Sequence, residues 1–144
     1  MISVINPRDL QQFHNPKRIE KIRRTPEAAF YGVREAQGHG NYAYIHYKGQ
    51  SLRMHYVDEG QRNGKVLLCL HGEPFWSQSY RRLIPYLNEN YRIIAPDFIG
   101  FGRSDKLVDW RSYDLELHEE TIVQLLRHLN GKRIICPLSE SDLV

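Results

Sequence analysis

The stretch LLCLHGEPFWSQSYRRLIPYL, residues 67–87, predicts a strand, a tight turn and a helix in direct succession. Its first residues belong to a continuous apolar run, which is typical of a strand buried on both faces of a parallel sheet. Gly72 and Pro74 mark the turn, and Pro85 is expected to end or bend the helix. The apolar face of that helix is expected to comprise Tyr80, Leu83, Ile84 and Leu87.

The turn His71-Gly72-Glu73-Pro74 has two interpretations. Gly72 permits a bend that a Cβ would obstruct, and the amide N–H of Glu73 can then point into a cleft at the carboxyl end of the sheet. An amide in that place can stabilise a developing oxyanion, an effect worth about 3–4 kcal/mol in catalysis. The alternative is an ordinary strand-to-helix turn, in which the Glu73 carboxylate merely complements the helix dipole instead of orienting water or substrate.

The composition limits the classes of function. Among 144 residues, 41% are hydrophobic and 26% are charged, which is ordinary for a globular domain. The net charge of +3 is too small to indicate nucleic acid as a partner, and the basic run 16–24 is expected to be solvated surface. Cys69 and Cys136 lie in apolar runs without metal-ligand spacing, so we expect reduced thiols and a cytoplasmic protein. No apolar leader and no run of about 18 apolar residues is present, so no membrane partner is expected.

The rest of the chain predicts an α/β fold. Residues 1–40 are polar, basic and interrupted by prolines, and are expected to form an N-terminal arm ahead of a domain spanning 41–144. Segments 42–49 and 51–60 alternate apolar and polar residues, which predicts a β-hairpin turning at Gly49-Gln50. A buried strand from Tyr91, an amphipathic helix over 112–129 stopped by Gly131, and another strand from Arg133 are expected to follow. The buried face of the 112–129 helix is predicted to be Leu115, His118, Ile122, Leu125, Leu126 and Leu129. This order predicts a hairpin followed by a mostly parallel sheet with flanking helices on both faces.

A second motif, APDFIGFGRSD, occupies residues 95–105. Its glycines resemble a dinucleotide-binding fingerprint, but the third position is Asp105 and no helix opens behind it. A structural role fits better: Asp97 and Ser104 would satisfy loop backbone groups, while Gly100 and Gly102 would allow close packing against the first turn. The motif therefore does not indicate a dinucleotide cofactor.

Aromatic residues and histidines complete the set of candidates. The aromatic residues near the two turns could either wall an apolar cavity or belong to the core; they are Phe75, Trp76, Phe98 and Phe101. His55, His118 and His128 lack the spacing of metal ligands and are assigned structural or exposed positions, so no metal site is expected.

The two turn motifs together resemble those of one family. Residues from about 51 to 130 are similar to the N-terminal part of haloalkane dehalogenases, which have the α/β-hydrolase fold; the matching pieces are HYVDEG, LCLHGEPFWSQSYRRLIPYL and RIIAPDFIGFGRSDK. The segment RRTPEAAF (23–30) also resembles one that these enzymes carry ahead of the sheet. The resemblance implies hydrolysis of carbon–halogen bonds in haloalkanes by an aspartate nucleophile, without a cofactor.

The resemblance also implies roles for individual residues. The backbone N–H of Glu73 would contribute to the oxyanion site and its side chain would contact water or halide, beside Trp76 of the same motif. The residues that match scaffold positions of the family are His71, Gly72, Pro74, Asp97, Gly100, Gly102 and Ser104. The sequence does not indicate an oligomeric state.

The nucleophile of the family has no counterpart that we would assign. Relatives continue the strand from Arg133 into an elbow of the Gln-Asp-Trp-Gly-Gly type, whereas this chain reads GKRIICPLSESDLV over 131–144. Alignment without a gap puts Glu140 at the nucleophile, but no glycine follows it and Pro137 cannot donate to the sheet. We therefore expect no catalytic residue here, the triad acid and histidine being absent as well. A frameshift, an early stop or a mis-assigned gene end would explain such a chain, which we expect to be inactive by itself.

Two alternatives stay open at this point. An epoxide hydrolase or another ester hydrolase of the same fold would share both motifs, because the residues that choose the reaction follow the elbow. A non-catalytic interaction module would instead use an exposed sheet edge to pair with another polypeptide. Halide release from 1-haloalkanes and co-purification of a stoichiometric partner distinguish these hypotheses.

Overall fold

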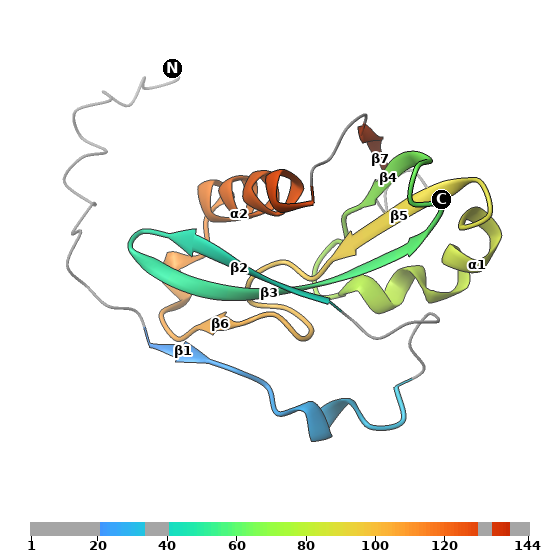
Figure 1. Ribbon diagram of the computed structural model, residues 1–144. Helices are drawn as coiled ribbons and strands as arrows, with labels where there is room; N and C mark the ends of the chain where they lie inside the picture. The colour runs from blue at the N-terminus through green and yellow to red at the C-terminus, as the bar shows by residue number, and fades with distance from the viewer. Residues whose placement is uncertain (1–20, 34–40, 130–133, 139–144) are drawn as a thin grey trace, which may run out of the picture.

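The computed structural model describes residues 21–33, 41–129 and 134–138 (Figure 1). A five-stranded mixed sheet has the order β2-β3-β5-β4-β7. Its strands are β2 (Asn41–Tyr47), β3 (Gln50–Gly60), β4 (Lys65–Cys69), β5 (Tyr91–Pro96) and β7 (Ile134–Leu138). The hairpin β2–β3 and the β3–β5 pair are antiparallel, whereas β5, β4 and β7 run parallel. The predicted combination of a hairpin with parallel strands is therefore confirmed, although among these pairings antiparallel ones are as frequent as parallel ones.

The hairpin turns one residue earlier than predicted. Lys48 and Gly49 both have positive φ, 45° and 78°, and Tyr47 pairs with Gln50 across the turn. Positive φ at both central residues is the geometry of a type I′ turn, whose twist matches that of the flanking strands. The prediction of Gly49-Gln50 was wrong because Gln50 is already the first residue of β3.

The central strands separate two cores. In β4 and β5 successive side chains point to opposite faces, so Leu68 and Ile94 join one apolar cluster while Cys69 and Ile93 join the other. Both faces are thus buried, as the continuous apolar runs predicted. Cys69 is a free, buried thiol whose burial raises its pKa to about 11. The side chain of Cys136 lies outside the description.

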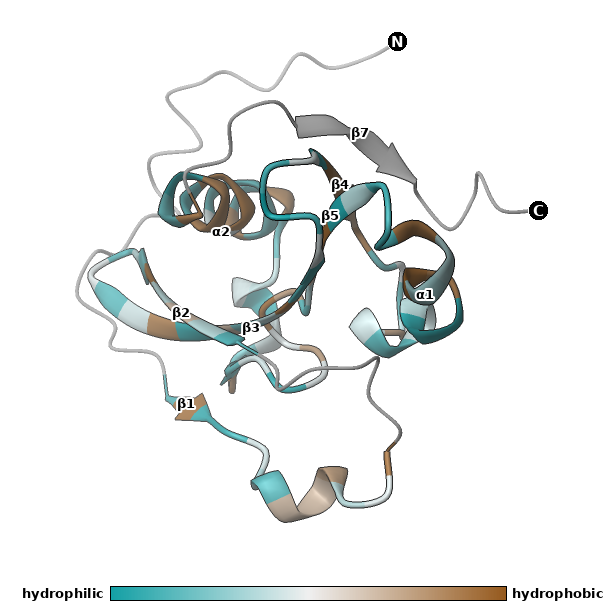
Figure 2. Ribbon diagram, turned by 45° about the vertical axis from the view of Figure 1, so that its right-hand side comes forward, coloured by the Kyte–Doolittle hydropathy of each residue, from teal (hydrophilic) through white to brown (hydrophobic). Residues whose placement is uncertain are grey.

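One face of the sheet is covered by α2 (Leu115–His128), which lies over the hairpin (Figures 1 and 2). The buried residues of this helix are Leu117, Thr121, Ile122 and Leu125. Leu115 was predicted to be buried but is 72% exposed. Leu117 and Thr121 take its place, and Thr121 tolerates burial because its Oγ1 donates to the carbonyl of Leu117 at 2.7 Å. The predicted stop at Gly131 lies outside the described residues.

The opposite face is covered by a 3₁₀ segment, η3 (Ser77–Arg82), and the single-turn α1 (Ile84–Leu87). The predicted helix is thus shorter and divided. Pro85 lies in the first turn of α1, where its missing N–H leaves no hydrogen bond unmade, so it begins a helix rather than ending one. Tyr80 and Ile84 are buried, which agrees with the predicted apolar face.

The described part of the predicted N-terminal arm, residues 21–33, is tied to the domain. β1 (Ile22–Arg23) pairs antiparallel with β6 (Lys106–Leu107), and the 3₁₀ turn η2 (Glu27–Phe30) follows it. A further 3₁₀ turn, η4 (Trp110–Ser112), precedes α2. The boundary between arm and domain at residues 40 and 41 stays a prediction.

Strand β7 carries Pro137, which has no N–H to donate. The pairing of β7 with β4 changes register between Leu67 and Cys69, at the level of this proline. Within the described ranges, no helix is long and apolar enough to cross a membrane.

Candidate active site

The His71 ring locks the turn that follows β4. The backbone N–H of Phe98 donates to His71 Nε2 at 3.0 Å, so this nitrogen carries no proton and Nδ1 donates to the carbonyl of Gly72 at 3.0 Å. The imidazole also contacts the rings of Phe98 and Phe101 edge-on, with centroids 4.8 and 5.4 Å away. One buried side chain thereby joins the first motif to the second.

The next residues of the turn are exposed. The Glu73–Pro74 peptide bond is cis, and the N–H of Phe75 donates to the carbonyl of Gly72 at 3.0 Å. For the amide of Glu73, no hydrogen-bond acceptor is found in the part of the chain that the structure describes. This donor therefore remains available at the carboxyl end of β4, as an oxyanion site requires.

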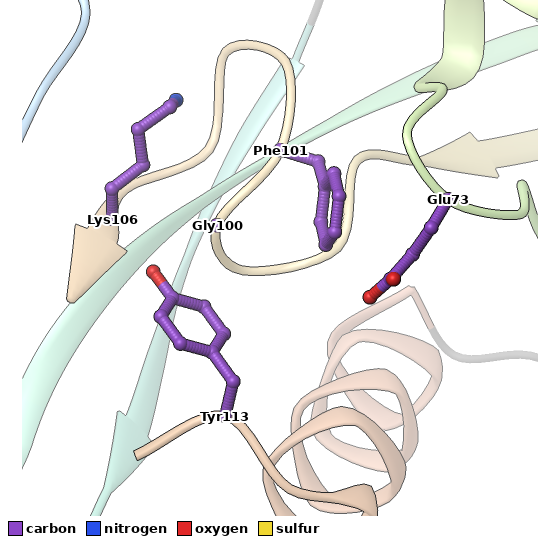
Figure 3. A pocket seen from close by; sticks show the side chains of 5 residues that line it. All are labelled: Glu73, Gly100, Phe101, Lys106 and Tyr113. Carbon is purple, nitrogen blue, oxygen red and sulfur yellow. The ribbon is translucent and has the colours of Figure 1, made fainter. Parts of the chain in front are cut away.

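A cavity of about 330 Å³ lies beside this turn, as Figure 3 shows. Its lining residues are Glu73, Gly100, Phe101, Lys106 and Tyr113. The side chains of Glu73 and Phe101 enter it from the turn after β4 and from the loop after β5. A carboxylate facing an aromatic ring gives the cavity one polar group on a mostly apolar wall.

The polar ends of the other lining side chains are engaged elsewhere. Lys106 Nζ donates to the carbonyls of Gly102 and Ser104 at 2.8 and 3.0 Å, and burial lowers the pKa of this amine. The Tyr113 hydroxyl accepts from the N–H of Leu107 at 2.7 Å and donates to its carbonyl at 3.1 Å. These contacts leave ring faces and methylenes toward the cavity, which suits an apolar ligand.

Gly100 is required at the cavity wall. Its φ is +102°, and a Cβ at this position would collide with the Tyr113 ring, whose Cζ would lie only 3.1 Å away. The absence of a side chain thus lets Tyr113 close against the loop that follows β5.

The buried Asp97 carboxylate holds the loops together. Its Oδ1 accepts from the N–H of Ser77 at 2.8 Å, and its Oδ2 accepts from the N–H of Arg103 and from His55 Nδ1, both at 2.9 Å. Burial by itself raises the pKa of Asp97, but the hydrogen bonds, above all that of His55, outweigh it and the pKa lies below its usual value. Asp97 therefore anchors three elements to one point: the start of η3, β3, and the loop of residues 97–105, which we call the glycine loop.

Ser104 and Gly102 complete that anchor. The Ser104 hydroxyl donates to the carbonyl of Asp97 at 2.6 Å and accepts from the N–H of His55 at 2.9 Å. Gly102 has a φ of +46°, and a Cβ there would meet the Asp97 carboxylate and lie 2.6 Å from Trp76 Cε3. The sequence placed Asp97 and Ser104 on loop backbone groups, and the structure shows these bonds directly.

The predicted aromatic candidates separate into different roles. Phe101 lines the cavity, Phe98 packs against the core, and Phe75 is half exposed. Trp76 is not among the lining residues; its ring lies 5.4 Å from that of Phe30. Nothing in the sequence indicated that a residue of the arm would cover Trp76.

His118 is nearer to the site than its sequence position suggested. Its ring contacts Phe98 at 5.0 Å, and its Nδ1 is buried without a partner among the described residues. Burial lowers the pKa of His118, while the charges of Glu73 and Asp114 act in the opposite direction. Helical periodicity alone could have placed His118 on the inner face but not beside Glu73. No group of three or more metal-ligating side chains occurs within the described ranges.

Residues 65–136 match the family described as the alpha/beta hydrolase fold. The chain belongs to the α/β hydrolase fold family. This α/β hydrolase is 39% identical over 111 residues to a haloalkane dehalogenase of Mycolicibacterium paratuberculosis, an alignment that covers 76% of this chain and 37% of that protein. It is 51% identical over 72 residues to a haloalkane dehalogenase of Mycobacterium marinum, covering 49% and 24% of the two chains.

Solved structures agree with these relatives. The tetrameric haloalkane dehalogenase DpaA from Paraglaciecola agarilytica is 43% identical, has a TM-score of 0.73, and is matched over 80% of this chain and 39% of its own. The epoxide hydrolase CorEH is 35% identical with a TM-score of 0.55, over 63% and 29% of the two chains. The α/β hydrolase chain thus spans less than half the length of each of these proteins.

The resemblance to haloalkane dehalogenases that the two motifs predicted is confirmed by these comparisons. The assignment of Glu140 as a poor counterpart of the nucleophile falls on a residue outside the described ranges. It stays a prediction, as do the roles assigned to Glu73, Trp76 and the scaffold residues.

Proposed function

We propose that this α/β hydrolase chain supplies the oxyanion half of a haloalkane dehalogenase site, acting on halogenated alkanes. The observation that carries the proposal is the turn after β4. There the Glu73 amide, for which the described residues offer no acceptor, and the Glu73 carboxylate adjoin a mostly apolar cavity. An apolar wall fits an alkyl chain, and a backbone N–H suits the oxyanion that forms when water attacks an alkyl-enzyme ester.

The chemistry needs groups besides these. In such a reaction an enzyme carboxylate displaces halide and forms the ester, and a histidine-activated water then cleaves that ester. Of the described residues, the His55–Asp97 pair has the right types, but it is buried beneath the loops and holds backbone groups. We propose that the chain alone does not complete the reaction, because Glu140, Ser141 and Asp142 stand where the elbow is expected.

A graft tests the proposal. Residues 21–129 replace the aligned segment of the dehalogenase DpaA, and halide release from 1-bromoalkanes and 1-chloroalkanes is measured. The graft is expected to release halide, because the turn and its anchor would be complete. Glu73→Ala keeps the backbone N–H but removes the carboxylate proposed to contact water or halide, the only carboxylate among the described residues that line the cavity. It is expected to lower the rate by about tenfold or more, because that carboxylate no longer positions the reacting groups. Glu89→Ala, which removes an exposed carboxylate after α1, is the control and should leave the rate unchanged.

The competing function has its own readout. A folded graft that opens an epoxide such as styrene oxide but releases no halide would favour epoxide hydrolysis as the function. The solved epoxide hydrolase CorEH resembles this chain in structure. The unmodified 144-residue chain, assayed in parallel, is expected to release no halide. Halide release by that chain would show that it carries a nucleophile that we have not assigned.

A further inference from the structure

The segment from residue 21 to residue 33, which we call the strap, reaches the candidate site at three places. The first is Arg24, whose Nε and Nη2 donate to the two carboxylate oxygens of Asp105 at 2.7 and 2.9 Å. Asp105 is fully buried, and its Oδ2 also accepts from the N–H of Arg53 at 2.9 Å. Because the paired hydrogen bonds fix both distance and angle, Arg24 ties the strap to the end of the glycine loop and to β3.

The second contact is Glu27 in η2. Its Oε1 accepts from the Tyr42 hydroxyl at 2.7 Å, and its Oε2 accepts from Arg103 Nη1. The backbone N–H of Arg103 in turn donates to Asp97 Oδ2 at 2.9 Å. The strap therefore holds, through one arginine, the loop whose backbone is bound to the buried carboxylate.

The third contact is aromatic. The Phe30 ring packs against the Trp76 ring, with centroids 5.4 Å apart, and the Arg103 guanidinium lies over the Phe30 ring, 4.3 Å from its centroid. Trp76 comes three residues after Glu73, and its carbonyl accepts from the N–H of Ser79 at 2.9 Å. Its ring contacts Phe30 and lies close to Gly102, where a Cβ would be 2.6 Å from Trp76 Cε3.

From these contacts we propose that the strap is a positioning element of the candidate oxyanion site, with Phe30 and Arg24 as its positioning residues. Phe30 restrains Trp76 and so the exit of the Glu73 turn, while Arg24 restrains the loop from Asp97 to Asp105. The assignment of a catalytic purpose to this restraint rests on the proposed function. The restraint itself is a property of the chain and can be measured without any activity.

The alternative is that the strap only adds general stability. In that case its loss would weaken the whole fold evenly. A positioning role predicts instead that the turn loosens while the central sheet does not, because the strap contacts loops and the hairpin rather than the interior of β4 and β5.

The experiment uses the full chain with Trp110, which is 75% exposed, replaced by phenylalanine, so that Trp76 is the single tryptophan. Phe30→Leu removes the ring and keeps an apolar side chain. We expect quenching of Trp76 fluorescence by acrylamide to increase at least about twofold, and amide exchange at Phe75 and Ser77 to accelerate by about three- to tenfold. Exchange at Ile94, in the central strand, should change by less than about twofold.

Two matched variants serve as controls for Phe30→Leu. Phe30→Tyr keeps the ring and should restore the parent values. Tyr31→Leu changes the neighbouring aromatic residue, which is 84% exposed, and should have no effect. A second route tests the other anchor: Arg24→Met should accelerate exchange at the amide of Arg103, whereas Arg23→Met should not.

The outcomes separate the two proposals. Unchanged exchange at Phe75 and Ser77 in Phe30→Leu, or equal acceleration at Ile94, would overturn the positioning role whether or not the graft releases halide. Accelerated exchange at the turn alone, combined with a graft that releases no halide, would support the restraint and contradict only the proposed function.

Discussion

Among single residues, Gly102 is constrained in two ways. Its backbone has a φ of +46°, and its Cα faces both the Asp97 carboxylate and the Trp76 ring. The positive φ disfavours any side chain because it strains the backbone, and the two neighbouring groups leave no space for one. Gly49, at the hairpin turn, has a φ of +78° but nothing within 4 Å of a Cβ. Comparing substitutions at Gly49 and Gly102 therefore distinguishes the cost of backbone strain from the cost of a steric clash.

Gly102→Ala is expected to lower the free energy of unfolding by about 3 kcal/mol or more, since strain and displacement of a buried carboxylate add. Gly49→Ala is expected to cost only about 1–2 kcal/mol, from strain alone. Urea denaturation followed by circular dichroism measures both. Equal losses in the two variants would mean that the space around Gly102 relaxes freely.

Secondary-structure elements are held at their ends and edges by side chains. Gln124 of α2 binds both backbone groups of His46, accepting from its N–H at 3.0 Å and donating to its carbonyl at 2.7 Å. His46 belongs to β2, the edge strand of the hairpin, so this clamp occupies groups that an edge strand would otherwise expose. At its N-terminus, α2 is capped by Asp114, whose Oδ1 accepts from the N–H of Leu117 at 2.8 Å.

Asp114→Ala is expected to lower the free energy of unfolding by about 1 kcal/mol, because the cap of α2 is lost and a backbone N–H is left without its partner. Asp114→Ser should retain most of that stability, since a serine hydroxyl can accept the same bond. Glu119→Ala, at an exposed position on the same helix, is the reference and should stay within about 0.5 kcal/mol of the parent. A loss in Glu119→Ala as large as in Asp114→Ala would remove capping as the explanation.

For the whole molecule, the buried Asp97 carboxylate connects parts that are distant in sequence. It binds His55 of β3, the N–H of Ser77 at the start of η3 and the N–H of Arg103 in the glycine loop. All of these donors favour the ionised carboxylate, and the pKa of Asp97 is accordingly lowered. Stability should therefore depend on pH through this residue.

The direction of the pH dependence follows from how the folded and unfolded chains bind a proton at Asp97. The unfolded chain protonates Asp97 near its ordinary pKa of about 3.9, whereas the folded chain holds on to the ionised form until lower pH. The stabilisation is thus fully present above pH of about 4 and is lost as pH falls through the depressed pKa. Urea midpoints measured from pH 7 down to pH 2.5 should show this decline.

Asp97→Asn is expected to be less stable at pH 7 by about 3 kcal/mol and to have a flatter dependence on pH below about 4. Glu27→Gln provides the comparison, because the pKa of Glu27 is also lowered but its side chain is 52% exposed. Solvent screening should leave most of the acid-side slope intact in that variant. An unaltered slope in Asp97→Asn would assign the acid sensitivity to other groups.

Much of the secondary structure could be predicted from local sequence patterns. Period-two alternation identified β2 and β3, and the apolar runs identified β4 and β5, because burial on one or both faces leaves a direct trace in residue order. The turn at Lys48-Gly49 was misplaced by one residue, since Gly49 alone does not show which of its neighbours also adopts a positive φ. The buried side of α2 was partly misassigned because Thr121 reads as polar until its hydroxyl finds a carbonyl within the helix.

The sequence by itself determined the order of strands and turns, the two motifs and the family to which they point, because these depend on short-range periodicity and on residue types at fixed spacing. Only the tertiary structure decided which residues meet: Phe101 and Tyr113 around the cavity beside Glu73, His55 on Asp97, and Phe30 of the strap on Trp76. Such contacts join residues up to several tens of positions apart. Their distances are set by how the strands pair and the loops close, which no local pattern encodes.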